Sequence, residues 1–564
     1  MSSSQTGILT GARLAVAALE GADVPVVFGL PGVHNLALWR ALGASPVRLV
    51  GVRHEQTAAY AADGYARAGG RVGVALTTTG PGAANTLGAL GEAWASRQPV
   101  VVIATDIPTR LRRPGVWRGV LHEATDQAAM FEPVTKETMR VRSAAEIGPA
   151  VERALATAAT APQRPVYVEI PTDLLDEPVP DPPEAGTSAT SPPRPPAEQL
   201  ARAVEIVESS RRPLIWAGGG ALQSGAGEAI GRLAERLVAP VVLTYSASGL
   251  LAPGHPCLVE APPHVPEAGA LWDEADVVLG IGTDFDGMMT QGWKQPQPPR
   301  LVSVNVDATD ASKNYLPDVL LEADARLAAE ELERRIEQRG GLESLASRVR
   351  ELNRAVRDGL ARSDPDALAF LDAMERVLPD DAVVVCDMCI PGYWLGGFAR
   401  TPLPRKLSYP LGWGTLGCAF PQALGAALAE AGPVVSISGD GGFLYACGEL
   451  AAAAQERIPF TAVIVDDGGY GMLRFDQDLK GDPRDGVDLH TPDFAALARS
   501  FGVRADVVEG LGERFEGTLG HHVRVAEPTV LVAKAALGPP PNVSPRWYRN
   551  AARPAEPAAG AKRR

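Results

Sequence analysis

The sequence predicts an α/β fold of three doubly wound parallel-sheet domains, on the strength of three observations. The chain has 564 residues, enough for three or four domains at about 150 residues each. Short runs rich in Val and Ile alternate with Ala- and Leu-rich stretches of helical length along the chain. These runs are apolar throughout, as strands covered on both faces of a sheet must be.

Nine such runs are the expected strands, three in each domain. They are residues 24–30, 71–78 and 99–105, then 213–220, 239–245 and 275–282, then 382–387, 433–440 and 459–467. Several end in glycine-rich turns. Because α/β folds bind ligands at the carboxyl ends of their strands, these turns are the first places to look for a site.

Changes in composition divide the chain into six segments. An amphipathic helix, not a signal peptide, opens the first domain, and its apolar residues have helical spacing. Prolines mark an extended linker, and charged residues with helical periodicity mark a connector. The expected segments are a first domain (1–178), the linker (179–197), a central domain (198–338), the connector (339–365), a third domain (366–538) and a C-terminal tail (539–564).

Charge and cysteine content exclude several classes of protein. The net charge of −14 repels phosphate backbones, so a nucleic acid is not an expected partner. No run of about 18 apolar residues predicts a membrane span. Five cysteines are an odd and sparse set for a chain of this length, which favours a reducing, cytoplasmic location.

Two acidic glycine loops carry the strongest chemical signal. Asp440 lies in Ser438-Gly439-Asp440-Gly441-Gly442, and Asp467 follows 27 residues later in Asp466-Asp467-Gly468-Gly469. Both follow predicted strands. Paired oxygen donors embedded in glycine suit a hard cation such as Mg²⁺ bound together with phosphates. A lone Gly-Asp-Gly also forms ordinary turns, so the pairing is what indicates a metal site.

The first domain adds two elements. Glu55 ends a short strand (49–55) and begins an Ala-rich helix, where a glutamate ordinarily interacts with the helix dipole. The segment Thr77-Thr78-Thr79-Gly80-Pro81-Gly82-Ala83-Ala84-Asn85 leads from a strand into another helix. Taken alone, this turn is a generic anion-binding helix start.

Together these motifs resemble those of one family. The ordered segments are PGVHN (31–35), RHEQTAAYAADGYAR (53–67), TTTGPGAANT (77–86), GWGTLGCAFPQALGAALA (412–429) and GDGGF with VDDGGYGM. They are similar to motifs of the thiamine-diphosphate enzymes of the acetolactate synthase and 2-oxo-acid decarboxylase family, over nearly the whole chain. The resemblance implies that residues 1–178 form a pyrimidine-binding domain and residues 366–538 a diphosphate-binding domain. It also implies a homodimer or homotetramer whose active sites are shared between subunits.

The resemblance also implies roles for individual residues. Glu55 corresponds to the carboxylate that hydrogen-bonds to N1′ of the cofactor's aminopyrimidine and promotes loss of the C2 proton. Leu416 corresponds to the apolar residue under the bent cofactor, although a core leucine at a helix start is the ordinary alternative. Asp440, Asp467 and the carbonyl of Gly469 correspond to the Mg²⁺ ligands. Further implied cofactor contacts are Thr78, Gly80, Pro81, Asn85, Asp387, Gly414, Gly439, Gly441, Gly442, Tyr470, Gly471 and Met472.

The chain departs from the family pattern at two places. Asp466-Asp467 stands where the family usually has two asparagines, which keeps a metal ligand but adds negative charge beside the diphosphate. Asp284 stands where FAD-carrying synthases usually have arginine, and an acidic side chain facing a pyrophosphate is unfavourable. FAD is therefore expected to be absent or weakly bound.

Histidines are the candidate substrate residues. His34 and His122 are expected to hold the carboxylate of a 2-oxo acid or to relay protons, and each has an ordinary surface or core role as its alternative. Arg474 is either a partner for a second substrate carboxylate or simply solvated. Cys386 and Cys389 form a CxxC without a second pair, so a buried strand residue is expected at Cys386 rather than a zinc ligand.

The predicted activity is decarboxylation of a 2-oxo acid and transfer of the hydroxyalkyl group to a second carbonyl, as in acetolactate synthase. The alternatives are a simple 2-oxo-acid decarboxylase and an acyloin lyase. A non-catalytic scaffold of the same family would lack Glu55 or the metal loop, and both are present. The sequence leaves the 2-oxo acid and the acceptor open.

Overall fold

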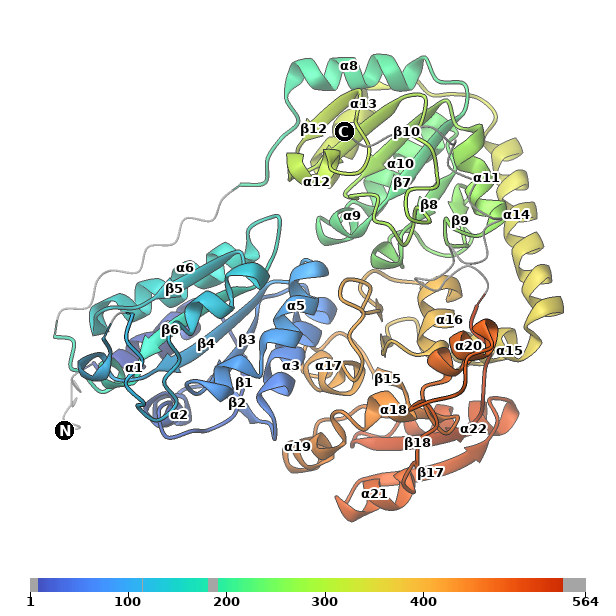
Figure 1. The fold of residues 1–564 in the computed structure, drawn as a ribbon. Helices are drawn as coiled ribbons and strands as arrows, with labels where there is room; N and C mark the ends of the chain where they lie inside the picture. The colour runs from blue at the N-terminus through green and yellow to red at the C-terminus, as the bar shows by residue number, and fades with distance from the viewer. Residues whose placement is uncertain (1–8, 114, 181–190, 541–564) are drawn as a thin grey trace, which may run out of the picture.

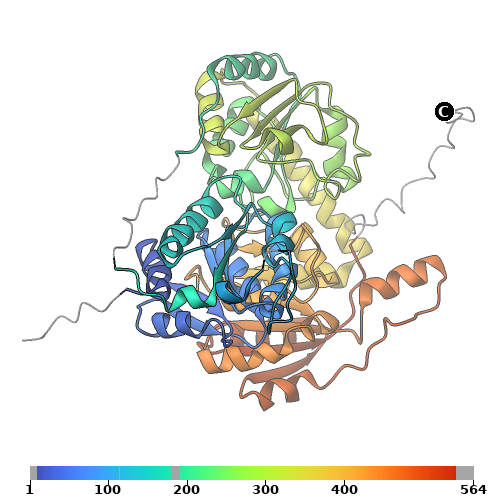
Figure 2. The ribbon, with the colours of Figure 1, turned by 60° about the vertical axis from the view of Figure 1, so that its left-hand side comes forward.

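The computed structural model describes residues 9–113, 115–180 and 191–540, and it contains three α/β domains (Figure 1). Each has a six-stranded sheet in which every strand pair is parallel, with helices on both faces. The first and third domains lie side by side below the central one (Figure 2). The predicted fold class is therefore confirmed.

The first and third domains share one strand connectivity. The first sheet has the order β2-β1-β3-β4-β6-β5 and the third the order β14-β13-β15-β16-β18-β17. The first contains β1 (Val26–Gly29), β2 (Arg48–Gly51), β3 (Gly73–Thr77), β4 (Val100–Asp106), β5 (Glu137–Arg140) and β6 (Val166–Pro171). The third contains β13 (Val383–Cys386), β14 (Leu407–Ser408), β15 (Val434–Gly439), β16 (Thr461–Asp466), β17 (Arg504–Glu509) and β18 (Thr529–Lys534).

The central sheet has the order β12-β11-β10-β7-β8-β9, which is the strand order of dinucleotide-binding folds. Its strands are β7 (Pro213–Ala217), β8 (Val241–Leu243), β9 (Leu258–Val259), β10 (Val277–Ile281), β11 (Leu301–Asn305) and β12 (Val319–Glu322). A long helix, α14 (Leu342–Ser363), connects this domain to the third.

Helices cover both faces of the sheets. In the first domain they are α1 (Gly11–Gly21), α2 (Leu36–Gly43), α3 (Glu55–Gly69), α4 (Pro81–Ala84), α5 (Leu87–Ala95), α6 (Ile147–Ala159) and α7 (Thr172–Leu175). In the central domain they are α8 (Ala197–Glu208), α9 (Gly219–Gln223), α10 (Gly227–Leu237), α11 (Pro266–Glu274), α12 (Ala308–Ser312) and α13 (Ala325–Arg335). In the third they are α15 (Pro365–Val377), α16 (Ile390–Phe398), α17 (Ala419–Ala426), α18 (Asp440–Phe443), α19 (Leu450–Glu456), α20 (Gly471–Lys480), α21 (Phe494–Ser500) and α22 (Glu513–His522).

Helices α3 and α17 join the first domain to the third. A Cβ at Gly64 would overlap the carbonyl of Gln422, and one at Gly425 would overlap the carbonyl of Ala61. The helices therefore meet backbone to backbone, and one apolar core runs through both domains. Within this contact Gln422 Nε2 donates to Asp63 Oδ2 at 2.6 Å, and burial raises the pKa of Asp63 to about 6.

The structure also bears on the expectations for the cysteines, a membrane span, the linker and the tail. The five cysteines are free thiols, and Cys386 is a buried strand residue as predicted. In the ranges described, no helix is both long and apolar enough to cross a membrane. Residues 181–190 of the expected linker and 541–564 of the expected tail, including Trp547 and Tyr548, lie outside the described residues.

Candidate active site

Two points of strand-order reversal define where ligands are expected to bind. In the first sheet the order reverses between β1 and β3, and in the third it reverses between β13 and β15. The turns after β1 and β3 carry His34 and Gly80, and those after β13 and β15 carry Asp387 and Asp440. The sequence-predicted residues therefore lie where an α/β sheet opens its crevice.

Glu55 is the first residue of α3 and lies in a hydrogen-bonded niche. The ring of His54 caps the helix by accepting a hydrogen bond from Gln56 N at 3.2 Å. Glu55 is buried, and Asn85 Nδ2 donates to its Oε2 at 2.9 Å. Its other oxygen lies 3.2 Å from the position a Cβ would take on Gly82. The structure thus brings Glu55 and Asn85 together at the turn that begins with Thr78.

His34 and His122 lie at the same turn. Their ring centroids are 5.2 Å apart in an edge-on arrangement, and His34 Nδ1 lies 2.8 Å from Thr79 Oγ1. A Cβ on Gly80, whose φ is +65°, would come within 2.6 Å of the carbonyl oxygen of His122. Burial and the nearby His122 lower the pKa of His34, because both disfavour the charged imidazolium.

Gln127 is a member of this cluster that the sequence did not reveal. It is fully buried, and its Oε1 accepts a hydrogen bond from Gly80 N at 2.6 Å. Its Nε2 donates to Tyr167 Oη at 2.8 Å and to the carbonyl of Thr105 at 2.9 Å. Gln127 therefore fixes the turn from behind. A glutamine in an otherwise unremarkable segment has no motif, so only the fold identifies it.

In the third domain, Asp387 organises the turn that precedes α17. Both of its carboxylate oxygens accept from Gly417 N, at 2.8 and 3.0 Å. Burial raises the pKa of Asp387 to about 7, against the lowering effect of these amides. A Cβ on Gly442 would lie 2.7 Å from Asp387 and 3.5 Å from Leu416, so three predicted residues meet here. Leu416 is half-buried above this turn.

The remaining third-domain candidates are glycines packed closely against side chains, and Met472. A Cβ on Gly441 would lie 2.6 Å from the Tyr470 ring, and one on Gly414 would lie 2.9 Å from Met388. A Cβ on Gly439 would touch Cys389. Met472 packs against the third-domain core just beyond Gly471. Gly441 is therefore required at its position by the close approach of the Tyr470 ring.

The loops carrying Asp440 and Asp467 fit a divalent cation. Asp440 Oδ1 accepts from Gly441 N at 2.7 Å, while its buried Oδ2 has no hydrogen-bond partner. Burial, together with the charges of Asp467 and Asp466, raises the pKa of Asp440 to about 7. A bound cation would relieve this repulsion and satisfy the free oxygen. Within the described ranges, no group of three or more His, Cys, Asp or Glu residues is arranged to hold a metal ion by itself.

The two extra carboxylates each have a basic partner. Lys534 Nζ forms an ion pair with Asp466, across the neighbouring strands β16 and β18. Arg474 Nη2 donates to Asp467 Oδ1 at 2.6 Å and to the Asp467 carbonyl at 2.9 Å. Arg474 is thus paired rather than solvated.

The two groups of site residues come from different domains. The first contains His34, Glu55, Thr78, Gly80, Pro81, Asn85 and His122, and the second contains the candidates from Asp387 onward. Within residues 9–113, 115–180 and 191–540, no hydrogen bond or ion pair joins a residue of the first-domain group to a residue of the third-domain group. Their neighbours do meet, since Gln56 Nε2 donates to the Tyr445 carbonyl at 3.3 Å.

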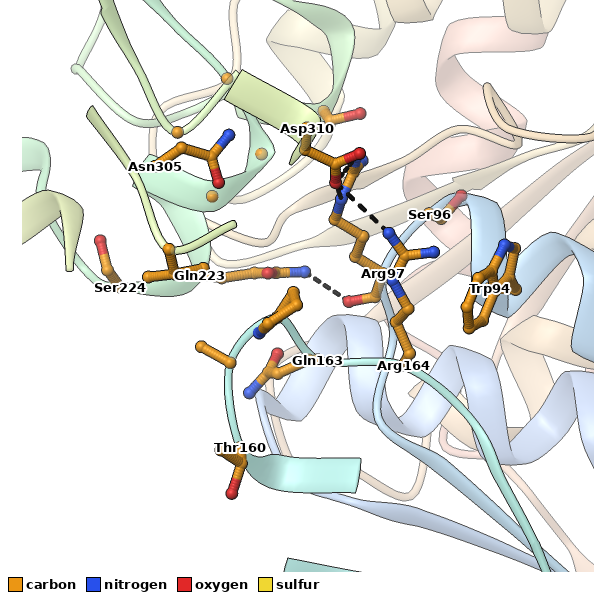
Figure 3. Close-up of a pocket in the computed structure, with 18 of the residues that line it drawn as sticks. Trp94, Ser96, Arg97, Thr160, Gln163, Arg164, Gln223, Ser224, Asn305 and Asp310 are labelled. Carbon is orange, nitrogen blue, oxygen red and sulfur yellow. Dashed lines mark hydrogen bonds and ion pairs between the residues drawn. The ribbon is translucent and has the colours of Figure 1, made fainter. Parts of the chain in front are cut away.

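A cavity of about 1330 Å³ lies at the strand-order reversal of the central sheet, facing the first domain, and Met388 and Leu411–Gly414 of the third domain also line it (Figure 3). Arg97 Nη2 reaches Asp310 at 2.6 Å and Asp284 at 3.0 Å, and Lys313 binds the same two carboxylates at 3.0 and 2.7 Å. Arg164 lies 3.3 Å from Asp310 and packs over the Trp94 ring.

This network bears on whether the cavity suits FAD. The described cations that line it are already paired with carboxylates. Gly218 and Gly220 pack directly against Gly282, which gives these glycines a structural reason of their own. The lining is therefore a poor match for a pyrophosphate.

We expect Arg97→Ala to lower the free energy of unfolding by about 2 kcal/mol, because hydrogen bonds between charged groups contribute about 1.5–3 kcal/mol each. Burial alone would raise the pKa of Asp284, but Arg97 and Lys313 hold it below its usual value. The stabilisation is therefore complete at neutral pH and is lost as the pH falls below about 4. Chemical unfolding measures it.

Arg232→Ala is the matched control, since Arg232 forms a more exposed ion pair with Glu333. Equal losses in the two variants would contradict a special role for the Arg97 network.

Comparisons with known proteins agree with this geometry. Residues 9–130 match the N-terminal binding domain of thiamine pyrophosphate (thiamine diphosphate) enzymes, 200–332 the central domain and 390–533 the C-terminal binding domain. A probable 2-ketoarginine decarboxylase from Pseudomonas aeruginosa is 37% identical over 90% of each chain. A probable acetolactate synthase large subunit from Methanocaldococcus jannaschii is 31% identical over 88% of this chain and 87% of that protein. An acetolactate synthase from Mycobacterium bovis is 31% identical over 88% and 83%. The chain belongs to the thiamine-diphosphate enzymes of acetolactate synthase and 2-oxo-acid decarboxylase type.

Proposed function

We propose that the protein uses thiamine diphosphate and Mg²⁺ to decarboxylate a 2-oxo acid and releases most of the product as the aldehyde. The overall reaction converts R–CO–COOH to R–CHO and CO₂. This ranks the decarboxylase, which the sequence placed second, ahead of the carboligase. The observation that carries the proposal is the His34–His122 pair beside the Glu55 turn, because an aldehyde product requires a proton donor at that place.

Each group of residues has its own part in this proposal. Thiamine diphosphate, when bound, supplies the electron sink that accepts the bonding pair left when CO₂ departs. Asp440, Asp467 and the Gly469 carbonyl would hold Mg²⁺, and the glycine turns around Asp387 would approach the diphosphate. Glu55 would hold and exchange the proton of the aminopyrimidine ring. His34 and His122 would orient the 2-oxo acid and deliver a proton to the product carbon.

Two copies of the chain are proposed to complete each site. The pyrimidine-side and diphosphate-side residues lie in separate groups within one chain. Exposed aromatic residues, Trp413 and Tyr445, border the third-domain group. Large exposed apolar side chains beside a site support an interface at that place.

The test is to incubate the protein with thiamine diphosphate, Mg²⁺ and a panel of 2-oxo acids, and to identify the products by mass. The panel includes 2-ketoarginine, which the Pseudomonas relative's name suggests. CO₂ with aldehyde supports the proposal. CO₂ with acyloin supports the second candidate, a carboligase, which the acetolactate synthase names of other relatives favour. No CO₂ from any substrate would refute both.

We expect His122→Gln to shift the products from aldehyde toward acyloin. Without the imidazole, proton delivery slows by on the order of 100-fold, and an added aldehyde acceptor competes more effectively. The ratio of aldehyde to acyloin measures the shift. His255→Gln in the central domain is the control. An unchanged ratio in the His122 variant would remove the histidine pair from the mechanism.

A further inference from the structure

The loop at the end of β16 is more negatively charged than the corresponding loop of the family that the chain resembles. Asp466 and Asp467 stand where the family usually has two asparagines, so the loop carries two additional negative charges. In the proposed function this loop lies beside a diphosphate, which is itself an anion. Unless these charges are balanced, the loop would repel the cofactor that it has to bind.

The structure balances Asp466 through the sheet. Asp466 is the last residue of β16, and Lys534, the last residue of β18, is its direct partner in the parallel register. The Asp466 side chain is buried and its carboxylate forms an ion pair with Lys534 Nζ. The lysine therefore reaches the carboxylate from the neighbouring strand.

Asp467 is balanced by Arg474 from the beginning of α20. Two hydrogen bonds join the guanidinium to this residue, at 2.6 Å to Oδ1 and at 2.9 Å to the carbonyl. Both side chains are largely buried, with 18% of each exposed. A cation in the first turn of a helix is disfavoured by the helix dipole, so the position of Arg474 requires a local anion.

Gly471, which has no side chain, leaves space for the Asp467 carboxylate. A Cβ at that position would overlap the Asp467 carboxylate. The carboxylate thus lies against the start of α20, where Oδ1 accepts from Arg474 and Oδ2 lies against Gly471. The second acidic partner of Arg474, Asp488, lies farther away at 3.6 Å from its Nε.

We propose that Arg474 and Lys534 are positioning residues that neutralise the diacidic loop and thereby allow it to bind Mg²⁺ and a diphosphate. Arg474 holds one oxygen of Asp467 and leaves the other for the metal. Lys534 cancels the charge of Asp466 behind the loop. This inference rests on the proposed function, and it explains how a chain with Asp466-Asp467 keeps a site that the family usually builds from asparagines.

A double-mutant cycle tests the Arg474 part. The variants are Arg474→Gln, Asp467→Asn and the double variant, and calorimetry measures the dissociation constant of thiamine diphosphate with saturating Mg²⁺. We expect Arg474→Gln to weaken binding by about 10-fold or more, as losses of partners behind a metal ligand do. In the Asp467→Asn background the same change has little effect, because the charge that the arginine balances is gone.

The Lys534 part has a parallel cycle with Lys534→Gln and Asp466→Asn. Arg484→Gln is the control in both cycles, because Arg484 pairs with the exposed Asp478 and has no ion pair with Asp466 or Asp467 among the described residues. Equal effects of Arg474→Gln with and without the Asp467 carboxylate would overturn the inference, as would binding as tight as that of the wild type. If Arg474→Gln fails to fold, the Lys534 cycle and the double variant still test whether the two basic residues neutralise the loop. A wild-type protein that binds no thiamine diphosphate refutes the proposed function instead.

Discussion

Replacing Glu55 by glutamine is expected to lower kcat for 2-oxo-acid decarboxylation by on the order of 100- to 10,000-fold, the usual contribution of a positioned acid or base. The physical reason is that an amide cannot take up and release the proton that a carboxylate exchanges. The fold should survive, because the amide oxygen still accepts the hydrogen bond from Asn85. Steady-state kinetics measure the loss of kcat, and thermal unfolding measures whether the fold survives.

Glu132→Gln provides the matched control, since Glu132 is exposed on the same domain. It should leave kcat and the melting temperature unchanged. Near-normal decarboxylation by the Glu55 variant would show that the carboxylate has another role, such as the helix-dipole interaction considered for it. A large drop in the melting temperature would make the kinetic result a folding effect.

Replacing Asp440 by alanine is expected to weaken Mg²⁺-dependent binding of thiamine diphosphate by more than about 100-fold, because partners behind a metal ligand alone contribute 10- to 100-fold. The variant loses a buried carboxylate whose Oδ2 has no protein partner in the described structure. Removing Mg²⁺ from the wild type with a chelator should give the same loss, and restoring Mg²⁺ should reverse it. Calorimetric titration with the cofactor measures both.

Asp478→Asn is the control for this change, because Asp478 is an exposed residue of α20 that pairs only with Arg484 among its described ion pairs. Its cofactor affinity should equal that of the wild type. If chelation leaves binding intact while Asp440→Ala removes it, the carboxylate acts on the cofactor directly and not through a metal.

The sequence predicts those parts of the fold that local chemistry determines. The buried strands β3 and β15 belong to predicted runs, and the glycine-rich turns that follow them lie at the strand-order reversals. Edge strands give no such signal. β9 and β14 have two residues each, and β17 is mostly exposed, so their residues lack the apolar pattern of a covered strand.

Contacts between distant segments lie beyond the sequence for a different reason. Arg97 meets Asp310 across 213 positions, and Lys534 meets Asp466 across 68, so each pairing depends on domain packing or sheet order. The sequence predicts an acidic side chain at Asp284 but not its ion pairs with Arg97 and Lys313, which depend on the fold. The roles assigned to Glu55, His34 and His122 stay predictions.

The backbone contact between α3 and α17 has a mechanical consequence. Where two helices touch through Gly64 and Gly425, no side chains remain to rearrange, and sliding or tilting would force carbonyl groups into Cα atoms. Within one chain, the first and third domains should therefore move as one rigid block. Opening of the proposed two-chain site would come from movement between the copies, from surface segments or from the central domain, whose ionic contacts with the first domain can break and re-form.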